Sequence, residues 1–263
     1  MESFNSRLER IVKERNSWLC VGLDISSEAL GLSDINKLRD YTFSVIDATR
    51  ELAVAYKPNF AFFERWGSAG FDWLEKTIAY IGDEHIIIAD AKRGDIGNTA
   101  EQYAKSIFGH FGFDSVTINP YMGSDSIKPF IKETDKGVFV LCRTSNYSAT
   151  ELQDRSVNGL PLYQLVADLV KNLNGLNNMG LVLGATAPDI LSNIREIAPS
   201  IPFLIPGIGF QGGELSNCLK VGNKKGVGII NISRGISFVG DKSKKAIHSA
   251  AINYVEQMRE ILN

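Results

Sequence analysis

The sequence contains little cysteine and no cluster of metal-binding residues. Its three cysteines are widely spaced and form no C-x-x-C pair: Cys20, Cys142 and Cys218. Its three histidines also stand apart, and no H-E-x-x-H motif is present. An odd number of separated cysteines disfavours both a disulfide framework and a structural zinc site, and it is typical of a reducing compartment. We therefore expect a cytoplasmic protein without a metal site.

Long apolar runs and basic stripes are absent as well. No apolar run approaches the roughly 20 residues that a membrane-spanning helix needs, and residues 1–18 predict a charged amphipathic helix without a signal-peptide core. The 28 lysines and arginines are scattered among 30 aspartates and glutamates, which gives a formal net charge of −2. This pattern disfavours a nucleic-acid or membrane partner but remains compatible with a small phosphorylated ligand.

What the sequence does contain is a regular alternation of strand and helix patterns. Short apolar runs rich in β-branched residues occur at 18–24, 54–59, 86–90, 115–119, 138–142, 181–185, 202–206 and 227–232. Helical patterns occur at 36–52, 69–81, 98–108, 124–132, 160–175, 188–197, 213–220 and 243–261. Alternating strands and helices predict right-handed βαβ units and a parallel sheet. Eight pairs fit a single (β/α)8 TIM barrel over residues 1–263 with a short N-terminal helix; a doubly wound open sheet is the alternative.

Polar side chains follow the predicted strands, where the active site of such a barrel lies. The positions are Asp24, Lys57, Asn59, Asp90, Lys92, Thr117, Asn119, residues 143–146, Gln211 and Arg234. Helix caps explain some of them, but cations are unfavourable near helix N-termini. The longest predicted loop, 143–159, has the length of a lid or binding loop.

The stretch "IIIADAKRGDIGNTAEQY" carries the densest charge. Asp90 and Lys92 project to the same side of a strand, Lys57 is expected on the neighbouring strand, and Asp95 follows in the loop. Each residue alone is compatible with a structural ion pair or a helix start. Together they predict an alternating array, because structural pairs seldom compensate for desolvating this many charges. An ammonium group held beside carboxylates is a proton donor and not an amine nucleophile, so the array favours a decarboxylase that protonates a carbanion.

A phosphate site is predicted after the last two strands. "LIPGIGFQGGEL" matches G-x-G-x-x-G, but the acidic residue expected about 20 positions later in a dinucleotide-binding fold is missing. In a barrel these glycines and "NISRGIS" occupy the two loops that usually bind phosphate. Arg234 supplies a cation there and Gln211 a neutral donor. The alternative is that the glycines only form turns and that Arg234 is solvated.

At this point the motifs resemble a known family. Asp90, Lys92, Asp95, Ile96 and Thr99 form an Asp-x-Lys-x-x-Asp-Ile-x-x-Thr pattern, preceded by "VGLD" and "YKPNFAFFE". With "TINPYMGSDS", "RTSN", "PGIGFQGG" and "SRGI", this pattern resembles the orotidine 5′-phosphate decarboxylase family, in its branch with longer loops.

The resemblance implies the cofactor-free conversion of orotidine 5′-monophosphate to uridine 5′-monophosphate and carbon dioxide. It implies a catalytic tetrad of Lys57, Asp90, Lys92 and Asp95, in which Lys92 protonates C6 and Asp90 lies near the departing carboxylate. It also implies a homodimer in which Asp95 and Thr99 reach the partner's site. The implied substrate-binding residues are Asp24, Lys57 and Asn59 at the ribose, Thr144 and Ser145 at the pyrimidine, Gln211 and Arg234 at the 5′-phosphate, and Pro206 and Gly235.

Three alternatives remain at this stage. A keto-gulonate phosphate decarboxylase shares Asp-x-Lys-x-x-Asp but uses magnesium. A class I aldolase would use Lys57 or Lys92 as a Schiff base. A barrel that binds a phosphosugar without catalysis is the third.

Overall fold

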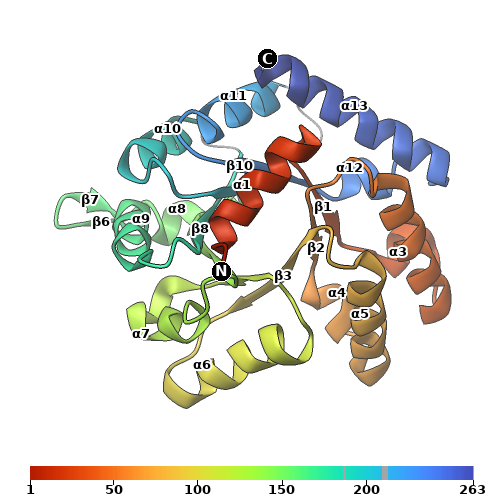
Figure 1. Ribbon diagram of the computed structural model, residues 1–263, viewed down its shortest axis with the longest axis horizontal. Coiled ribbons are helices and arrows are strands. Elements are labelled where there is room, and N and C mark those ends of the chain that lie inside the picture. The colour runs from red at the N-terminus through yellow and green to blue at the C-terminus, as the bar shows by residue number, and fades with distance from the viewer. Residues whose placement is uncertain (186–187, 209–212, 263) are drawn as a thin grey trace.

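The computed structural model describes residues 1–185, 188–208 and 213–262, and its centre is a closed parallel barrel (Figure 1). Around the barrel the strand order is β1-β10-β9-β8-β5-β4-β3-β2. The strands are β1 Leu19–Leu23, β2 Ala55–Pro58, β3 Ile86–Arg93, β4 Ser115–Ile118, β5 Gly137–Arg143, β8 Met179–Leu183, β9 Phe203–Pro206 and β10 Gly228–Ile232. The predicted TIM barrel is confirmed, and the open-sheet alternative is wrong because β1 pairs with both β10 and β2.

Helices surround the barrel and cover the outer face of the sheet. The longer ones are α3 Ile35–Thr49, α5 Gly67–Ile81, α6 Gly97–Ala104, α9 Leu162–Leu173, α10 Pro188–Ile197, α11 Gly213–Gly222 and α13 Lys244–Leu262. Shorter turns are α2 Ser27–Leu30, α4 Phe60–Glu64, α7 Ser124–Ile127, α8 Ala149–Leu152 and α12 Arg234–Ser237, with a π-helix at Lys105–His110 and 3₁₀ turns at Pro120–Met122 and Lys128–Phe130. Strands buried on both faces explain the nearly continuous apolar runs of the sequence.

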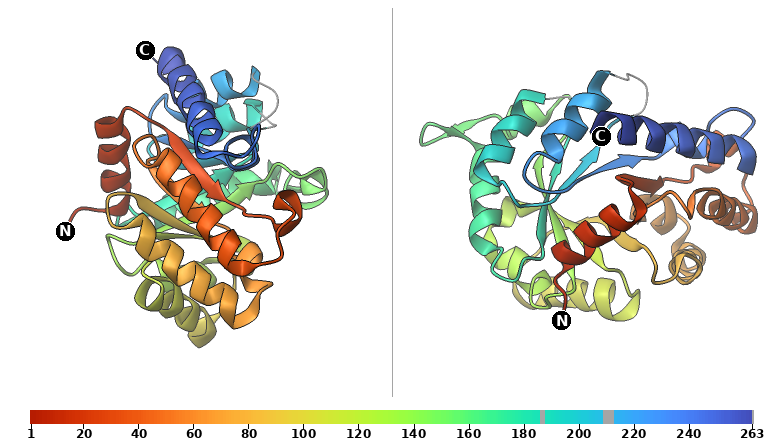
Figure 2. Two further views of the ribbon diagram at one scale, coloured as in Figure 1. Left: turned by 90° about the vertical axis from the view of Figure 1, so that its right-hand side faces the viewer. Right: turned by 45° about the horizontal axis from the view of Figure 1, so that its top comes forward.

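The predicted N-terminal helix, α1 (Phe4–Arg15), closes the bottom of the barrel. It begins at Ser3, whose side chain accepts a hydrogen bond from the Ser6 amide. Phe4 packs edge-to-face on Phe139, with ring centroids 6.0 Å apart. A side chain at Gly137 would collide with the Phe4 ring, so glycine is required there for this contact. In the side view of Figure 2, α1 lies at one end of the barrel and the β6–β7 hairpin at the other.

That hairpin lies within the long loop predicted after the fifth strand. Strands β6 (Ser156–Val157) and β7 (Leu160–Pro161) pair antiparallel. The turn consists of Asn158 and Gly159, both with positive φ, as an Asn-Gly hairpin turn requires. No helix among the described residues is long and apolar enough to cross a membrane.

One arginine lies completely inside the outer layer. Arg195 on α10 has no exposed surface, and its guanidinium lies 3.5 Å from the centre of the Phe203 ring. Its Nη atoms donate to four backbone carbonyls, those of Ala198, Pro199, Ile201 and Gly222. The last of these carbonyls belongs to α11, so Arg195 ties the C-terminal ends of α10 and α11 together. Burial lowers the pKa of Arg195 to about 10, which leaves the group protonated at neutral pH.

Candidate active site

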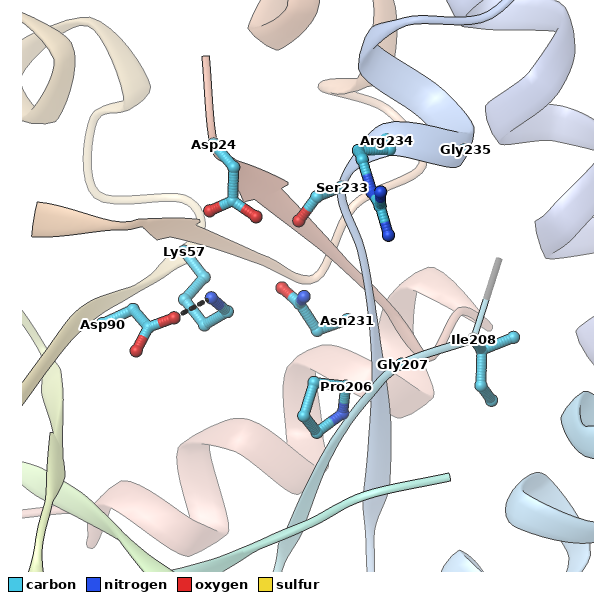
Figure 3. Close-up of a pocket in the computed structure, with 10 residues that line it drawn as sticks. All are labelled: Asp24, Lys57, Asp90, Pro206, Gly207, Ile208, Asn231, Ser233, Arg234 and Gly235. Atoms are coloured by element: carbon cyan, nitrogen blue, oxygen red, sulfur yellow. Dashed lines mark hydrogen bonds and ion pairs between the residues drawn. The ribbon is translucent and has the colours of Figure 1, made fainter. Parts of the chain in front are cut away.

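Two adjoining cavities open at the C-terminal ends of the barrel strands. One has a volume of about 320 Å³ and the other about 440 Å³. Both are lined by Lys57, Asp90 and Pro206. The first also contacts Asp24, Gly207, Ile208, Asn231, Ser233, Arg234 and Gly235 (Figure 3). The second also contacts Lys92, Thr117, Leu141, residues 144–146, Gln153, Val182 and Leu204.

A carboxylate held between two ammonium groups lies where the cavities meet. Lys57 Nζ donates to Asp90 Oδ2, and Lys92 Nζ donates to Asp90 Oδ1 at 2.5 Å. Lys57 and Asp90 are 4% and 9% exposed, whereas the Lys92 side chain is 52% exposed. The Lys57–Asp90 pair is therefore buried at the cavity walls, and Lys92 is the member whose side chain is half exposed, in the second cavity.

Burial and ion pairing oppose each other in this array. Burial disfavours the charge on Lys57, but attraction to Asp90 and Asp24 outweighs it and raises the lysine's pKa. Burial likewise raises the pKa of Asp90, but Lys57 and Lys92 outweigh it and hold that pKa at about 2. Asp90 is therefore ionised across the physiological range.

Strand β3 is irregular where it carries this array. Ala89 pairs with Val116 on β4, and the next pair is Arg93 with Ile118. The intervening residues of β3 thus face a single residue of β4, which is a bulge. Lys92 lies in this bulge with φ of +45°, a left-handed conformation that costs a residue other than glycine of the order of 1 kcal/mol or more.

The first cavity contains an acceptor and a cation at separate places. The Asp24 carboxylate points into it, and its buried Oδ1 has no hydrogen-bond partner among the described residues (Figure 3). Arg234 follows β10 and is exposed at the cavity's other side, beside Gly235. Gly207 has φ of +100°, a conformation that favours glycine. Gln211, predicted to assist Arg234, lies outside the described residues.

The second cavity is bounded by the loop after β5. Thr144 and Ser145 line it, as does Gln153, whose Oε1 accepts a hydrogen bond from the Thr144 amide at 2.8 Å. Next to this bond, Arg143 pairs with Asp154 at 2.7 Å, so two contacts join the start of the loop to residues 153–154. Thr144, one of the two residues predicted at the pyrimidine, is thus held by contacts within the loop itself.

Three predicted residues line neither cavity. Asp95 is half-buried, and its Oδ1 accepts a hydrogen bond from the neighbouring Ile96 amide. Thr99 is exposed on α6. Asn59 starts α4, where its side chain accepts from the Ala61 amide, and its backbone bridges to Asp90. A single chain therefore assembles Lys57, Asp90 and Lys92, and leaves Asp95 apart from them.

Three polar residues that border the cavities were not singled out from the sequence. Asn231 and Ser233, at alternate positions of the β10 segment, line the first cavity, and Gln153 lines the second. Asn231 had a detectable signal, since it is a polar residue inside the apolar run "GIINI". Thr117 is among the polar residues named from the sequence, but its hydrogen-bond partners depend on the bulge in β3.

Metal-binding side chains do not gather in this region. No group of three or more histidine, cysteine, aspartate or glutamate side chains with metal-site geometry occurs within the described ranges. The described site instead offers two ammonium groups, two carboxylates, one guanidinium and the amide and hydroxyl groups named above.

The chain was compared with known proteins. A model of the "Orotidine 5'-phosphate decarboxylase / HUMPS family" matches residues 17–248. An orotidine 5′-phosphate decarboxylase of Haloarcula marismortui is 43% identical over 99% of this chain and 98% of its own. One of Cupriavidus necator is 42% identical with the same coverage. The solved structure of the Leishmania donovani OMP decarboxylase has a TM-score of 0.89 and 38% identity and covers 98% of both chains.

Proposed function

The chain belongs to the orotidine 5′-phosphate decarboxylase / HUMPS family and is a decarboxylase of pyrimidine biosynthesis, and on this premise we propose that Lys92 protonates C6 of orotidine 5′-monophosphate without a cofactor. The observation that carries the proposal is the Asp90 carboxylate, held between Lys57 and Lys92 where two cavities meet. The products are uridine 5′-monophosphate and carbon dioxide.

The two cavities suit the two ends of this substrate. The 5′-phosphate lies toward Arg234, which offers a charge-assisted hydrogen bond, and Gly235 lies beside it. Gln211 keeps its predicted role as a neutral donor to this phosphate. The ribose lies over Asp24, whose unpartnered oxygen accepts from a hydroxyl, and next to Lys57. The pyrimidine enters the cavity bordered by Thr144 and Ser145. This places C6 and its carboxylate over Asp90 and Lys92.

The reaction then follows from the fixed charges. The C6–carboxylate bond breaks, carbon dioxide leaves, and the electron pair stays on C6 as a vinyl carbanion. Lys92 Nζ transfers its proton to C6 and recovers one from solvent, so that one proton is consumed per turnover. The Asp90 carboxylate repels the substrate carboxylate but attracts the Lys92 ammonium group that faces the carbanion. Because these charges are held in place before the reaction, they lower the barrier without reorganisation. Binding energy from the distant phosphate is used in the transition state.

A second copy of the chain completes the site in this proposal. Asp95 and Thr99 lie outside their own cavities, and large apolar side chains are exposed on the same turn and on the 119–122 segment: Ile96 at 51%, Tyr121 at 78% and Met122 at 45% exposure. The 119–122 segment is adjacent to this turn, because the Asn119 amide donates to the Arg93 carbonyl at 2.8 Å. An exposed apolar patch beside unused charged residues is typical of an interface. We propose a homodimer in which each Asp95 and Thr99 serves the partner's site.

The 143–159 loop closes over the ligand and excludes water. All three cysteines are buried thiols, which is compatible with the reducing cytoplasm.

A spectrophotometric assay with orotidine 5′-monophosphate tests the function. We expect turnover that is undiminished by EDTA and unaffected by borohydride. Loss of activity with EDTA and its recovery with magnesium would favour the keto-gulonate phosphate type of chemistry. A borohydride-trapped adduct would favour a Schiff base. Binding of orotidine 5′-monophosphate without a change in absorbance would favour the barrel that binds a phosphosugar without catalysis. Sedimentation velocity tests the dimer, and a mixture of Lys92→Ala and Asp95→Ala chains should regain one intact site per heterodimer.

A further inference from the structure

The bulge in β3 leaves two backbone donors without partners in the sheet. Asp90, Ala91 and Lys92 lie between the paired residues Ala89 and Arg93, so their amides do not follow the regular ladder. Backbone donors that are removed from water need a replacement acceptor. The amides of Ala91 and Lys92 both donate to the same replacement acceptor, Oγ1 of Thr117 on β4.

Thr117 also contacts the carboxylate of the array. Its Oγ1 accepts from the Lys92 amide at 2.9 Å and from the Ala91 amide at 3.1 Å. The hydroxyl proton is then directed to Asp90 Oδ1 at 3.3 Å or to the Ala89 carbonyl at 3.4 Å. Thr117 is 2% exposed, so no bulk water competes for these bonds. One hydroxyl thus joins the backbone of Lys92 to the carboxylate that its own ammonium group contacts.

We propose that Thr117 is a positioning residue that holds Lys92 in its left-handed conformation and aims Nζ at the reacting carbon. This inference rests on the proposed role of Lys92. Without the hydroxyl, the Lys92 amide loses its acceptor and the backbone relaxes toward ordinary negative φ. Nζ, at the end of a long side chain, then moves away from the geometry set by Asp90. A misplacement of about 1 Å can cost about 100-fold in rate.

The experiment separates the hydroxyl from the methyl group. Thr117→Val keeps the shape and removes the hydroxyl. Thr117→Ser keeps the hydroxyl and removes the methyl, and Thr117→Ala removes both. The matched control is Thr77→Val, because Thr77 is equally buried but donates only to the Trp73 carbonyl within α5. The measurements are kcat and KM for orotidine 5′-monophosphate, the affinity for uridine 5′-monophosphate, and the urea midpoint of unfolding.

We expect Thr117→Val to lower kcat by about 100-fold while product affinity changes less than about 3-fold, since the lost interaction acts on the transition state. Thr117→Ser should recover kcat to within about 5-fold of the unmodified chain, and Thr77→Val should leave it unchanged. If Thr117→Val does not fold, the kcat ratio of Thr117→Ser to Thr117→Ala decides, because that pair differs only in the hydroxyl.

Equal kcat for the serine and alanine variants would overturn the inference, as would a Thr117→Val enzyme with unchanged kcat. These outcomes differ from failure of the proposed function. If the unmodified chain does not turn over the substrate, the function is wrong. If it does, and Lys92→Ala still turns over, the role of Lys92 is wrong. If only the Thr117 variants behave normally, the positioning role alone is wrong.

Discussion

The molecule buries positive charge in two ways. Lys57, at the mouth of the barrel, is paired with Asp90, and this pair faces a cavity and the second cation Lys92. Arg195, in the outer layer, is surrounded by four neutral carbonyls and an aromatic ring. In the first arrangement, charged groups line a cavity, where they can contact a ligand. The second lines none of the described cavities.

The difference shows that a buried cation alone does not identify a functional site. Arg195 contributes its hydrogen bonds to the fold, because it donates to carbonyls at the ends of two helices, where intrahelical donors run out. The two lysines at the barrel mouth instead line the cavity in which the proposed substrate binds. Removing a residue of each kind should therefore affect different measurements.

The largest effect is expected at the barrel mouth. Lys92→Ala should lower kcat by about 10⁴-fold, since it removes the proposed proton donor. The free energy of unfolding should change by about 1 kcal/mol or less, because the side chain is 52% exposed. Steady-state kinetics and urea unfolding measure the two quantities. Lys76→Ala is the matched control, since Lys76 is 50% exposed and pairs with Asp72. Turnover retained by Lys92→Ala would contradict the proton-donor role.

The opposite result is expected in the outer layer. Arg195→Met keeps the length of the side chain but leaves buried carbonyls without donors, at a cost of roughly 3–5 kcal/mol. Turnover by the folded fraction at 25 °C should stay within a few-fold. Arg10→Met serves as the control, because Arg10 is exposed and pairs with Glu2 and Glu14. If Arg195→Met lost turnover while its stability was unchanged, the contrast between the two regions would fail.

A smaller effect is expected at the edge of the first cavity. Arg234→Ala should lower kcat/KM for orotidine 5′-monophosphate by about 10- to 100-fold, as a charge-assisted hydrogen bond contributes about 1.5–3 kcal/mol. The same variant should have little effect on decarboxylation of the nucleoside that lacks the phosphate. Equal losses with both substrates would count against a phosphate contact.

The smallest effect is expected only in acid. The pKa of Asp90 is lowered to about 2 from an ordinary value near 3.8. A lowered carboxyl pKa contributes stability that is complete above about pH 5 and is lost as the pH falls from about 4 through 2. The difference in unfolding free energy between the unmodified chain and Asp90→Asn should therefore be constant above pH 5 and shrink from pH 4 to 2. Arg195→Met should show no such change. Shrinkage that begins at neutral pH would show that the array does not hold Asp90 ionised.

The sequence was sufficient for the barrel and for three members of the array. Periodicity places all eight strands, because a parallel barrel strand is buried on both faces and its run of apolar residues is continuous. The alternation of side chains along β3 correctly predicts that Asp90 and Lys92 face the same side of the sheet. It does not reveal the bulge or the positive φ of Lys92, since both depend on the register with β4.

Other features depend on contacts between distant segments and have no local pattern. Arg195 lies in "SNIREIAP", where an arginine in the last helical turn is ordinary, and its burial follows from the packing of α10 on α11. The hairpin at Asn158 and Gly159 had a recognisable turn signal, but the prediction treated the whole segment as a loop. The role of Asp95 depends on a second chain and remains a prediction.

The left-handed backbone of Lys92 has a consequence for how this position evolves. Glycine fits that conformation without strain and is one of the few residues that would relieve it. Mutation under selection for stability alone should therefore drift toward glycine or asparagine at position 92. If Lys92 has the proposed role, selection for activity opposes that drift. In a library randomised at this codon, a screen for folding and a screen for turnover should enrich different residues.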